Sequence, residues 1–305
     1  MYGAGVIGSI FAFKLKSGGN DVTILARGER FEYLKNNGIN LRDDLKHESF
    51  QIHIDVTDKL NPEDVYDLIL VIMQRQQITS ILPILKENRK VPSIIFVGNN
   101  MEGAAEYSKI LNEDRILLGF GGVGGYRENQ LIITAYLDQI SFYVGELDGK
   151  ISDRLKQLEG VFTNAGIEVK LSDDIDAWLK THVSFISPLA MGSYAAKKRN
   201  TTLGRDIELL NLSIIGIREN IKALKELNIP ILPKKFKTLS WLPKFIIRGK
   251  LLELLNSDYG KIALSGHARA AKNEMARITE DFRDFIKGVK TDFSANNKLY
   301  ELSFA

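Results

Sequence analysis

The feature that most restricts the fold of this chain is a change of pattern near residue 171. Before it, short runs rich in β-branched and aromatic residues alternate with segments of helical apolar spacing. The runs expected to form strands are 21–26, 67–73, 92–98, 115–120, 130–136, 140–145 and 167–172. Strands that alternate with helices form a mostly parallel, doubly wound sheet covered by helices on both faces. The first half is therefore expected to be an α/β domain over 1–171.

After residue 172 the strand signal ends. Helical spacing is found in the segments 173–196, 205–228, 241–255 and 259–288. A chain of 305 residues is long enough for two domains, since single cores stop growing at roughly 250–300 residues. We therefore expect an all-α domain over 172–305, with a role in substrate binding or dimerisation.

Three glycines near the start of the chain indicate a cofactor site. Gly3, Gly5 and Gly8 form G-x-G-x-x-G, followed at once by the helical segment "VIGSIFAFKLKSGG" and the β-run "DVTILA". In a Rossmann-type domain these glycines allow a tight turn, close approach to a pyrophosphate and close helix–strand packing, with the phosphates at the helix N-terminus. An ordinary glycine turn before an amphipathic helix is the alternative. The residues predicted to bind the cofactor here are Gly3, Ala4, Gly5, Val6, Ile7 and Gly8.

The strand that should precede this turn is almost missing. Only Met1 and Tyr2 come before Gly3, whereas the first strand of such a sheet is normally central and several residues long. Either the sequence is truncated or the sheet has a stub at its centre. If the stub is real, we expect both stability and cofactor affinity to suffer.

The end of the next β-run favours NADP over NAD. An acidic residue there usually binds the ribose 2′-hydroxyl of NAD, while an arginine suits the 2′-phosphate of NADP. The run "DVTILA" is followed by Arg27, with Arg30 one turn further on. The alternative is that Arg27 is an ordinary surface residue and Glu29 contacts the ribose.

Composition excludes several classes of protein. The 41 Lys and Arg against 38 Asp and Glu give a net charge of +3, which argues against a nucleic-acid partner. The absence of cysteine excludes disulfides, thiolate metal sites and cysteine nucleophiles, and we expect no metal. No apolar run reaches the ~18 residues of a membrane span, and no signal peptide is evident. A soluble, cytoplasmic protein is expected. A basic membrane-surface helix over 242–255 is a weaker alternative.

Several segments resemble the ketopantoate reductases (2-dehydropantoate 2-reductases), NADP-dependent enzymes with a Rossmann domain followed by a helical domain. "YGAGVIGS" and "VTILARGER" resemble that family's glycine turn and the stretch that reads the 2′-phosphate. "FVGNNMEG" is similar to its N-G loop, which implies that Asn99 lies near nicotinamide and substrate. "GFGGVGGYRE" implies that Gly125 lies against the cofactor. "DAWLKTHVSFISPLA" is similar to the helix of the catalytic lysine, which falls on Lys180.

The helix of Lys180 can also be interpreted without the family. An apolar stripe with helical spacing comprises Ile175, Trp178, Leu179, His182, Val183 and Ile186. Lys180, Ser184 and Ser187 lie on a separate polar face. Taken alone, such a lysine is usually solvated. With the resemblance, Lys180 is expected to stabilise the charge on the oxygen of a 2-oxo acid and to supply its proton.

A second catalytic candidate lies in the last predicted helix. Glu274 best matches the family's glutamate that contacts substrate or cofactor, and the sequence places His267, Ala270 and Ala271 on the same helix side. The serine upstream of that glutamate corresponds to Ser257 or Ser265, and the spacing decides for neither. The alternative is a surface glutamate paired with a nearby basic residue.

Three departures from the family pattern leave the substrate open. Gln74 stands where many members have a lysine near the cofactor, and Ser184 and Ser187 stand where two asparagines are expected. The serine hydroxyls reach less far than asparagine amides, so the pocket would suit a bulkier or differently hydroxylated acid. The resemblance implies NADPH-dependent reduction of ketopantoate to pantoate in pantothenate and coenzyme A biosynthesis, with a small-molecule substrate and a possible homodimer. The alternatives are a related NAD(P)-dependent dehydrogenase of another hydroxy or amino acid, and a non-catalytic NADP-binding relative.

Overall fold

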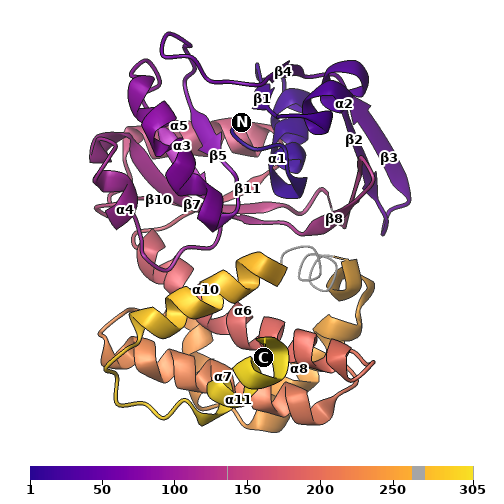
Figure 1. Ribbon diagram of the computed structural model, residues 1–305, viewed down its shortest axis with the longest axis vertical. Coiled ribbons are helices and arrows are strands. Elements are labelled where there is room, and N and C mark those ends of the chain that lie inside the picture. The colour runs from indigo at the N-terminus through magenta and orange to yellow at the C-terminus, as the bar shows by residue number, and fades with distance from the viewer. Residues whose placement is uncertain (136, 263–271, 305) are drawn as a thin grey trace. The chain divides into compact units, whose positions relative to one another are not determined.

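The computed structural model describes residues 1–135, 137–262 and 272–304, and the chain forms two compact units (Figure 1). Unit 1 comprises Met1–Gly98 and Gly103–Ile175, and unit 2 comprises Asn99–Glu102 and Asp176–Ala305. The segment Asn99–Glu102 therefore leaves the α/β unit and packs with the helices. The sequence pattern had suggested a single change of unit at residues 171 and 172.

Unit 1 contains a central sheet whose order is β11-β10-β7-β6-β5. All neighbours in it are parallel except β10 and β7. The strands are β5 (Ile69–Val71), β6 (Ile94–Val97), β7 (Ile116–Gly122), β10 (Ser141–Glu146) and β11 (Glu168–Leu171). A further parallel pair is formed by β1 (Thr23–Leu25) and β4 (Asp55–Thr57). Tyr2 bridges Leu25 and Val71 in parallel, so this one residue joins the pair to the larger sheet.

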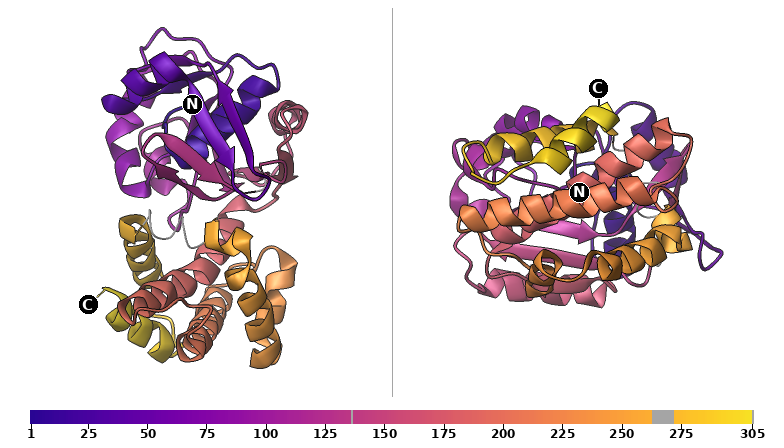
Figure 2. Two further views of the ribbon diagram at one scale, coloured as in Figure 1. Left: turned by 90° about the vertical axis from the view of Figure 1, so that its right-hand side faces the viewer. Right: turned by 90° about the horizontal axis from the view of Figure 1, so that it is seen from below.

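The helices of unit 1 lie on both faces of the central sheet, as expected for a doubly wound α/β domain (Figures 1 and 2). On one face, Phe11 makes edge-to-face contacts with Phe142 and Phe162 at centroid distances of 5.3 and 6.2 Å. On the other face Phe96 stacks on Tyr107. The helices are α1 (Val6–Ser17), α2 (Glu29–Asn37), α3 (Arg75–Glu87), α4 (Ala105–Ser108) and α5 (Asp153–Asn164), with a 3₁₀ turn η1 (Glu113–Arg115).

A second sheet of order β3-β2-β9-β8 departs from the expectation that 130–136 belongs to the parallel sheet. Its strands are β2 (Ile39–Asp43), β3 (Glu48–Ile52), β8 (Gly125–Glu128) and β9 (Leu131–Thr134). Only Asn129 and Gln130 connect β8 to β9, and Asn129 has φ +55°. A two-residue connection with positive φ favours a hairpin, so the antiparallel pairing of β8 and β9 is decided locally.

The regular elements in the described part of unit 2 are all helices, joined by turns and loops (Figure 2). Its elements are α6 (Ile175–Lys198), α7 (Ile207–Glu226), the 3₁₀ segment η2 (Lys234–Ser240), α8 (Lys244–Asn256), α10 (Lys272–Phe285) and α11 (Ser294–Phe304). The N-cap of α7 is Asp206, whose carboxylate accepts from the Leu209 N–H at 3.0 Å. Two apolar clusters hold α6 against these helices, one of them containing Val183, Ile217 and Met275.

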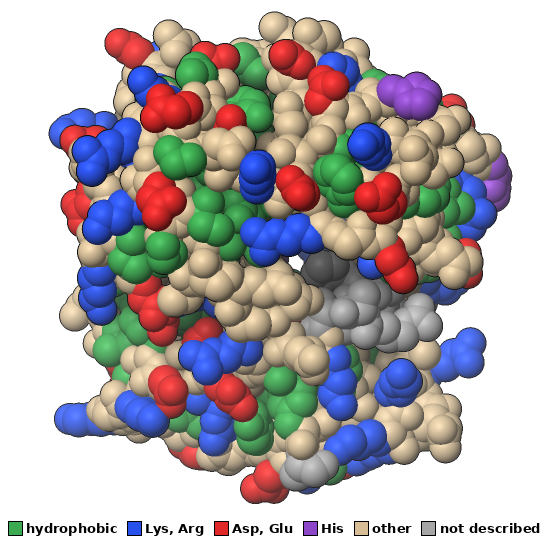
Figure 3. Space-filling model, turned by 45° about the horizontal axis from the view of Figure 1, so that its top comes forward, with side chains coloured by type: hydrophobic (Ala, Val, Ile, Leu, Met, Phe, Trp, Pro, Cys, Tyr) green, Lys and Arg blue, Asp and Glu red, His purple; other side chains and the backbone are tan. Residues whose placement is uncertain are grey.

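Within the described residues, no helix is long and apolar enough to span a membrane. On the face drawn in Figure 3, lysine and arginine side chains are interspersed with aspartate and glutamate. This mixture agrees with the small net charge of +3.

Candidate functional site

The glycine bend at residues 3–8 is shaped by close backbone packing. Gly3 has φ +123°, and a Cβ on it would lie 2.2 Å from the Ile72 carbonyl oxygen. A Cβ on Gly8 would lie 2.2 Å from the Gly3 carbonyl oxygen. Both positions require glycine because a side chain would collide with backbone rather than with a movable group.

Gly5 is different, because a Cβ on it would meet no atom within 4 Å. Gly5 is also the N-cap of α1, and no side chain caps that helix end. The first N–H groups of α1 have no partner within the helix, and the helix dipole favours an anion there. The bend thus combines open space with unsatisfied donors, and its residues fit a pyrophosphate.

Arg30 supports this bend from beneath, a role that the sequence did not predict. Its Nε donates to the Ala4 carbonyl at 3.3 Å, and its Nη2 donates to the Ser9 hydroxyl at 3.2 Å. Nη1 donates to the carbonyl and side-chain oxygens of Gln130. Burial, with a smaller contribution from Arg127, lowers the pKa of Arg30 to about 10, so the group stays charged at neutral pH. An arginine one turn after a phosphate-reading position was the only available signal.

Arg27, by contrast, is exposed just beyond the end of β1. Its Nη2 donates to the Tyr2 hydroxyl at 3.3 Å. Burial raises the pKa of Tyr2, and the guanidinium opposes this shift. The tyrosine therefore stays protonated at neutral pH, and the charge of Arg27 remains available for an anion.

Gly125 and Gln74 lie beside elements that form the bend. A Cβ on Gly125 would lie 2.3 Å from the Ile133 carbonyl oxygen and 3.3 Å from a methyl of Val6, the first residue of α1. Gln74 is the N-cap of α3 and accepts from the Gln76 amide at 2.8 Å. It follows β5 by three residues, near the Ile72 carbonyl that contacts Gly3.

Unit 2 holds the predicted catalytic lysine. Lys180 is only 7% exposed, and its ammonium donates to the carboxylate of Asp176, one turn earlier on α6. The ammonium also lies 5.3 Å from the centre of the Phe285 ring on α10. A buried lysine needs such partners because desolvation penalises an isolated charge. The other carboxylate oxygen of Asp176, Oδ1, is buried without a hydrogen-bond partner among the described residues.

Ser184 and Ser187 are engaged in helix packing. The buried Ser184 hydroxyl donates to the Thr181 carbonyl at 2.7 Å. The Ser187 hydroxyl lies 3.1 Å from that of Thr279 on α10, and Thr279 in turn donates to the Met275 carbonyl. A contact between either serine and substrate would require these bonds to be exchanged, and it stays a prediction.

Asn99 and Glu274 form a second polar group in unit 2. The Asn99 amide donates to the Glu274 carboxylate at 3.4 Å, and the Asn99 Oδ1 is buried without a partner in the described part of the chain. Burial raises the pKa of Glu274, and the bond from Asn99 opposes the shift. Burial and the charge of Glu274 together raise the pKa of Tyr194.

These two polar groups lie at different ends of the contact between α6 and α10. Lys180 meets Phe285 near the end of α10, Ser187 meets Thr279 in the middle, and Tyr194 is affected by Glu274 near its start. At a rise of 1.5 Å per residue, Glu274 and Phe285 are about 16 Å apart along the helix. The structure therefore pairs Lys180 with Asp176 rather than with Glu274. The i, i+4 spacing of aspartate and lysine in "DAWLK" was the signal for this pair.

The structure describes some of the remaining candidate residues and not others. The Ser257 hydroxyl donates to the Leu254 carbonyl at 2.6 Å and accepts from the Gly260 N–H, so it terminates α8. Ser265, His267, Ala270 and Ala271 lie outside the described residues. Trp178 and His182 stack on each other at 5.2 Å within α6.

Comparisons with known proteins connect this arrangement to a family. Residues 1–149 match the family described as "Ketopantoate reductase PanE/ApbA". A 2-dehydropantoate 2-reductase from Pyrococcus abyssi is 23% identical over 98% of this chain and 94% of its own length. An uncharacterized oxidoreductase from Bacillus subtilis, YkpB, is 25% identical over 58% of this chain, and the match spans 59% of that protein.

A solved structure of similar fold is that of D-mandelate dehydrogenase with NADH and anilino(oxo)acetate. It has a TM-score of 0.78 at 16% identity, covering 99% of this chain and 97% of that one. At this identity the likeness establishes the fold alone, an α/β domain of Rossmann type followed by a helical domain. Residues 1–149, which carry the glycine bend, thus match the ketopantoate reductase PanE/ApbA family, and nearly the whole chain is similar to the 2-dehydropantoate 2-reductase from Pyrococcus abyssi.

Proposed function

We propose that the protein reduces a 2-oxo acid to the 2-hydroxy acid with NADPH, and that 2-dehydropantoate (ketopantoate) is the preferred substrate. The observation that carries the proposal is the buried ammonium of Lys180, held by Asp176. A buried, oriented ammonium can stabilise negative charge that develops on a carbonyl oxygen and can protonate it. The match to a ketopantoate reductase family and to the Pyrococcus relative supports the choice of substrate.

The glycine bend supports the cofactor assignment. Residues 3–8 would hold the pyrophosphate at the N-terminus of α1, and the backbone of Gly125, which lies beside Val6, would contact the cofactor. Arg27 would bind the 2′-phosphate. When bound, the dihydronicotinamide would supply a hydride, a proton with two electrons, to the carbonyl carbon.

Lys180 completes the reaction from the protein side. Its Nζ donates a proton to the carbonyl oxygen as the C=O double bond becomes a C–O single bond, and solvent later restores the proton to the amine. Asp176 keeps the ammonium in one rotamer and is a positioning residue rather than a catalytic one. Asn99 and Glu274 lie about 16 Å away along α10, too far for one small 2-oxo acid to contact both this pair and Lys180, and they would bind a polar group of the substrate only if the carbonyl is held at their end.

The direct test is a panel of 2-oxo acids with the purified chain, following NADPH oxidation. Ketopantoate, 2-oxoisovalerate, pyruvate and benzoylformate differ in branching, hydroxylation and ring size. We expect the highest kcat/KM for ketopantoate. A clear preference for benzoylformate would assign the protein to another hydroxy acid, and NADPH binding without oxidation by any of the four would refute the reductase proposal.

The choice between NADPH and NADH is tested by Arg27→Ala. Loss of a charge-assisted bond to the 2′-phosphate should raise the KM for NADPH by about 10-fold or more and leave that for NADH unchanged. Arg89→Ala, at an exposed position on the same unit, is the matched control. If the wild-type chain instead prefers NADH and Glu29→Gln removes that preference, the ribose contact belongs to Glu29.

A further inference from the structure

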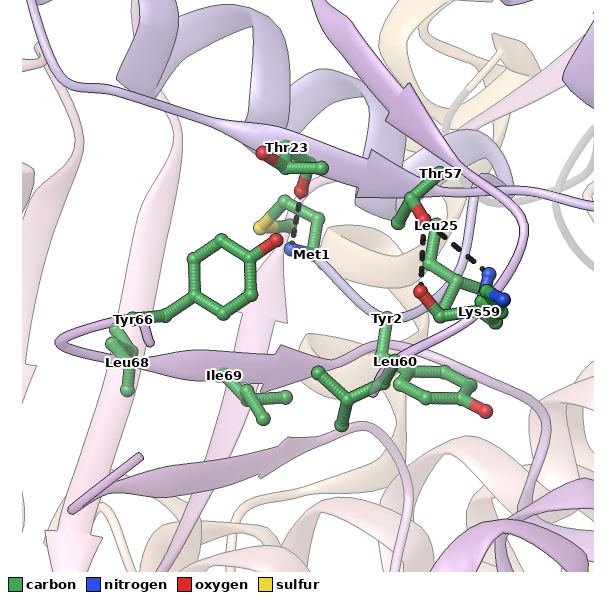
Figure 4. A pocket seen from close by; sticks show the side chains of 10 residues that line it. All are labelled: Met1, Tyr2, Thr23, Leu25, Thr57, Lys59, Leu60, Tyr66, Leu68 and Ile69. Carbon is green, nitrogen blue, oxygen red and sulfur yellow. Dashed lines mark hydrogen bonds between the residues drawn. The ribbon is translucent and has the colours of Figure 1, made fainter. Parts of the chain in front are cut away.

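A recess beside β1 in unit 1 is too small for an organic ligand (Figure 4). Met1, Thr23, Tyr66 and Ile69 are among the side chains that line it. Its volume is about 30 Å³, which suits a water molecule. A surface segment of unit 2 is the stronger candidate for binding a further partner.

The residues 234–250, "KKFKTLSWLPKFIIRGK", combine positive charge with apolar side chains, and we call them the basic segment. They include six basic residues and no acidic one. Because the whole chain has a net charge of only +3, the rest of the chain is net acidic. A block of like charges among apolar residues is typical of a segment that contacts a partner of opposite charge.

The cations of the basic segment are not neutralised within the described residues. They are Lys234, Lys235, Lys237, Lys244, Arg248 and Lys250. None of them forms an ion pair in the part of the chain that the structure describes. On the chain just after α8, by contrast, Lys261 pairs with Asp258 at 2.7 Å. Five of the six cations are exposed and Arg248 is half-buried, so their charge is available to a partner.

Two aromatic side chains of the same segment are exposed to solvent. Trp241 is 69% exposed and Phe245 is 65% exposed. The helix α8 nevertheless packs part of its apolar surface inward, since Ile247 and Leu251 are only 5% and 6% exposed. Packing of α8 within unit 2 therefore explains Ile247 and Leu251, but it leaves the two rings in water.

The backbone that carries Trp241 is held in place by α7. Arg218 on α7 donates through Nε to the Leu239 carbonyl at 3.0 Å and through Nη2 to the Leu242 carbonyl. The side chains of Leu239 and Leu242 also pack against an apolar cluster of unit 2. The chain is thus fixed on both sides of Trp241, and the exposed ring lies on an ordered backbone rather than on a frayed end.

We propose that the basic segment docks on the surface of a bilayer that contains anionic phospholipids. Aromatic side chains are enriched at the membrane–water interface, where one end of the side chain is apolar and the other is wet. Lysine side chains around them are attracted to the negative surface and keep their ammonium groups in water while their stems contact the apolar layer. The basic segment offers both of these interactions together.

The docking differs from that of a helix lying flat in the membrane interface, which the sequence allowed over 242–255. Ile247 and Leu251 remain in the core of unit 2, so they are not free to contact lipid. Only Trp241, Phe245 and the side chains next to them enter the interface. Binding is therefore reversible and depends on the fraction of anionic lipid.

The charge and composition of the segment argue against two other partners. A two-fold symmetric contact with a second copy of the chain places the same patch against itself, so six cations would face six cations. A single-stranded nucleic acid would neutralise the charges and stack on the rings. The side chains beside the rings, however, are the aliphatic Leu242, Pro243 and Ile246, which suit an acyl layer better than a base.

The test measures sedimentation of the purified full-length chain with vesicles. Vesicles of phosphatidylcholine alone are compared with vesicles in which about a third of the lipid is phosphatidylglycerol. We expect binding to the anionic vesicles to be tighter by about 10-fold or more. Most of this difference should disappear at about 0.5 M salt, because the charges are then screened.

The contribution of the rings is tested by combining Trp241→Ala with Phe245→Ala. This variant keeps every charge and should bind anionic vesicles about 10-fold more weakly. Val65→Ala, which removes a 72% exposed side chain from unit 1, is the control. The chain has two tryptophans, and the other, Trp178, is buried. Fluorescence should therefore shift to shorter wavelength when anionic vesicles are added, and Trp241→Phe should abolish the shift while it keeps most of the binding.

The contribution of the charges is tested by combining Lys237→Gln with Lys244→Gln. Binding to anionic vesicles should weaken by about 10-fold, and binding to phosphatidylcholine should not change. Lys290→Gln combined with Lys298→Gln removes two exposed charges elsewhere in unit 2 and is the matched control. All four lysines are exposed, so Tm should stay the same in both variants.

Four results would overturn the proposal. Two are equal binding to both kinds of vesicle and undiminished binding by the variant without rings. The third is binding to a single-stranded oligonucleotide without binding to vesicles, which would assign the segment to nucleic acid. The fourth is a dimer in sedimentation equilibrium that the variant without rings dissociates, again without vesicle binding, which would assign it to a second copy. Vesicle binding is measured without NADPH, so these outcomes are independent of whether ketopantoate is reduced.

Discussion

The two ends of the contact between α6 and α10 hold different chemistry. At one end, Lys180 has a charged partner in Asp176 and the ring of Phe285, so its ammonium is stabilised in place. At the other end, Glu274 accepts a hydrogen bond from the neutral amide of Asn99, and burial raises its pKa. The end that holds Asp176 thus stabilises the charged form of Lys180, whereas the end that holds Asn99 favours the neutral form of Glu274. The proposed reaction needs the first kind of site at its carbonyl oxygen.

The largest expected effect is that of Lys180→Ala. Turnover should fall by about 10³-fold, because both the proton donor and the charge facing the carbonyl oxygen are lost. NADPH affinity, measured by fluorescence titration, should not change. Lys197→Ala removes an exposed lysine from the same helix and should leave turnover intact. Undiminished turnover in Lys180→Ala would remove this residue from the mechanism.

Asp176→Asn should lower kcat by about 10-fold with little change in KM, because the ammonium loses the group that holds it in one rotamer. Asp176→Glu keeps the charge and should recover part of the loss, which a purely structural role for the carboxylate would not explain. Asp173→Asn, on the exposed chain just before α6, is the control. A change confined to KM would place Asp176 in substrate binding instead.

Glu274→Gln should reduce turnover by less than about 10-fold, since the glutamate lies about 16 Å along α10 from the residue that contacts Lys180. Steady-state kinetics of this variant beside Lys180→Ala decide which end of the contact receives the carbonyl. A larger loss for Glu274→Gln would assign the reacting oxygen to the Asn99 end.

The same variant tests the electrostatics of that end. Because burial raises the folded-state pKa of Glu274 above its usual 4.5, its contribution to stability is fully present below that value and is lost as the pH rises through the folded-state pKa. Glu274→Gln should therefore have a higher Tm than the wild type at neutral pH, and the difference should vanish near pH 4. A difference that is independent of pH would contradict the raised pKa.

The smallest effect is expected for a substitution in the middle of the α6–α10 contact. Ser187→Ala leaves the Thr279 hydroxyl with its bond to Met275 and should cost about 1 kcal/mol of unfolding free energy, with kcat/KM unchanged. Ser193→Ala removes a hydroxyl that donates to the Leu189 carbonyl within α6 and is the matched control. A marked loss of kcat/KM in Ser187→Ala would support the substrate contact predicted from the sequence.

Local patterns were sufficient for the parts of the molecule that depend on neighbours along the chain. The spacing of Gly3, Gly5 and Gly8 predicted the bend, and the alternation of strands and helices predicted the α/β unit followed by helices. The i, i+4 pair of Asp176 and Lys180 was also readable from the sequence, although only the lysine was identified. Periodicity is a property of a single helix or strand, so it can be recognised in the sequence without knowing how the elements pack.

The tertiary structure decided what depends on contacts between distant segments. It brought Arg30 under the glycine bend, moved Asn99 into the helical unit beside Glu274, and separated Glu274 from Lys180 along α10. It also placed Tyr2 between Leu25 and Val71, so that this residue joins β1 to the larger sheet. The physical reason is that a helix pattern specifies which face is buried, whereas the partner of each residue is chosen by packing and hydrogen bonding across the whole core.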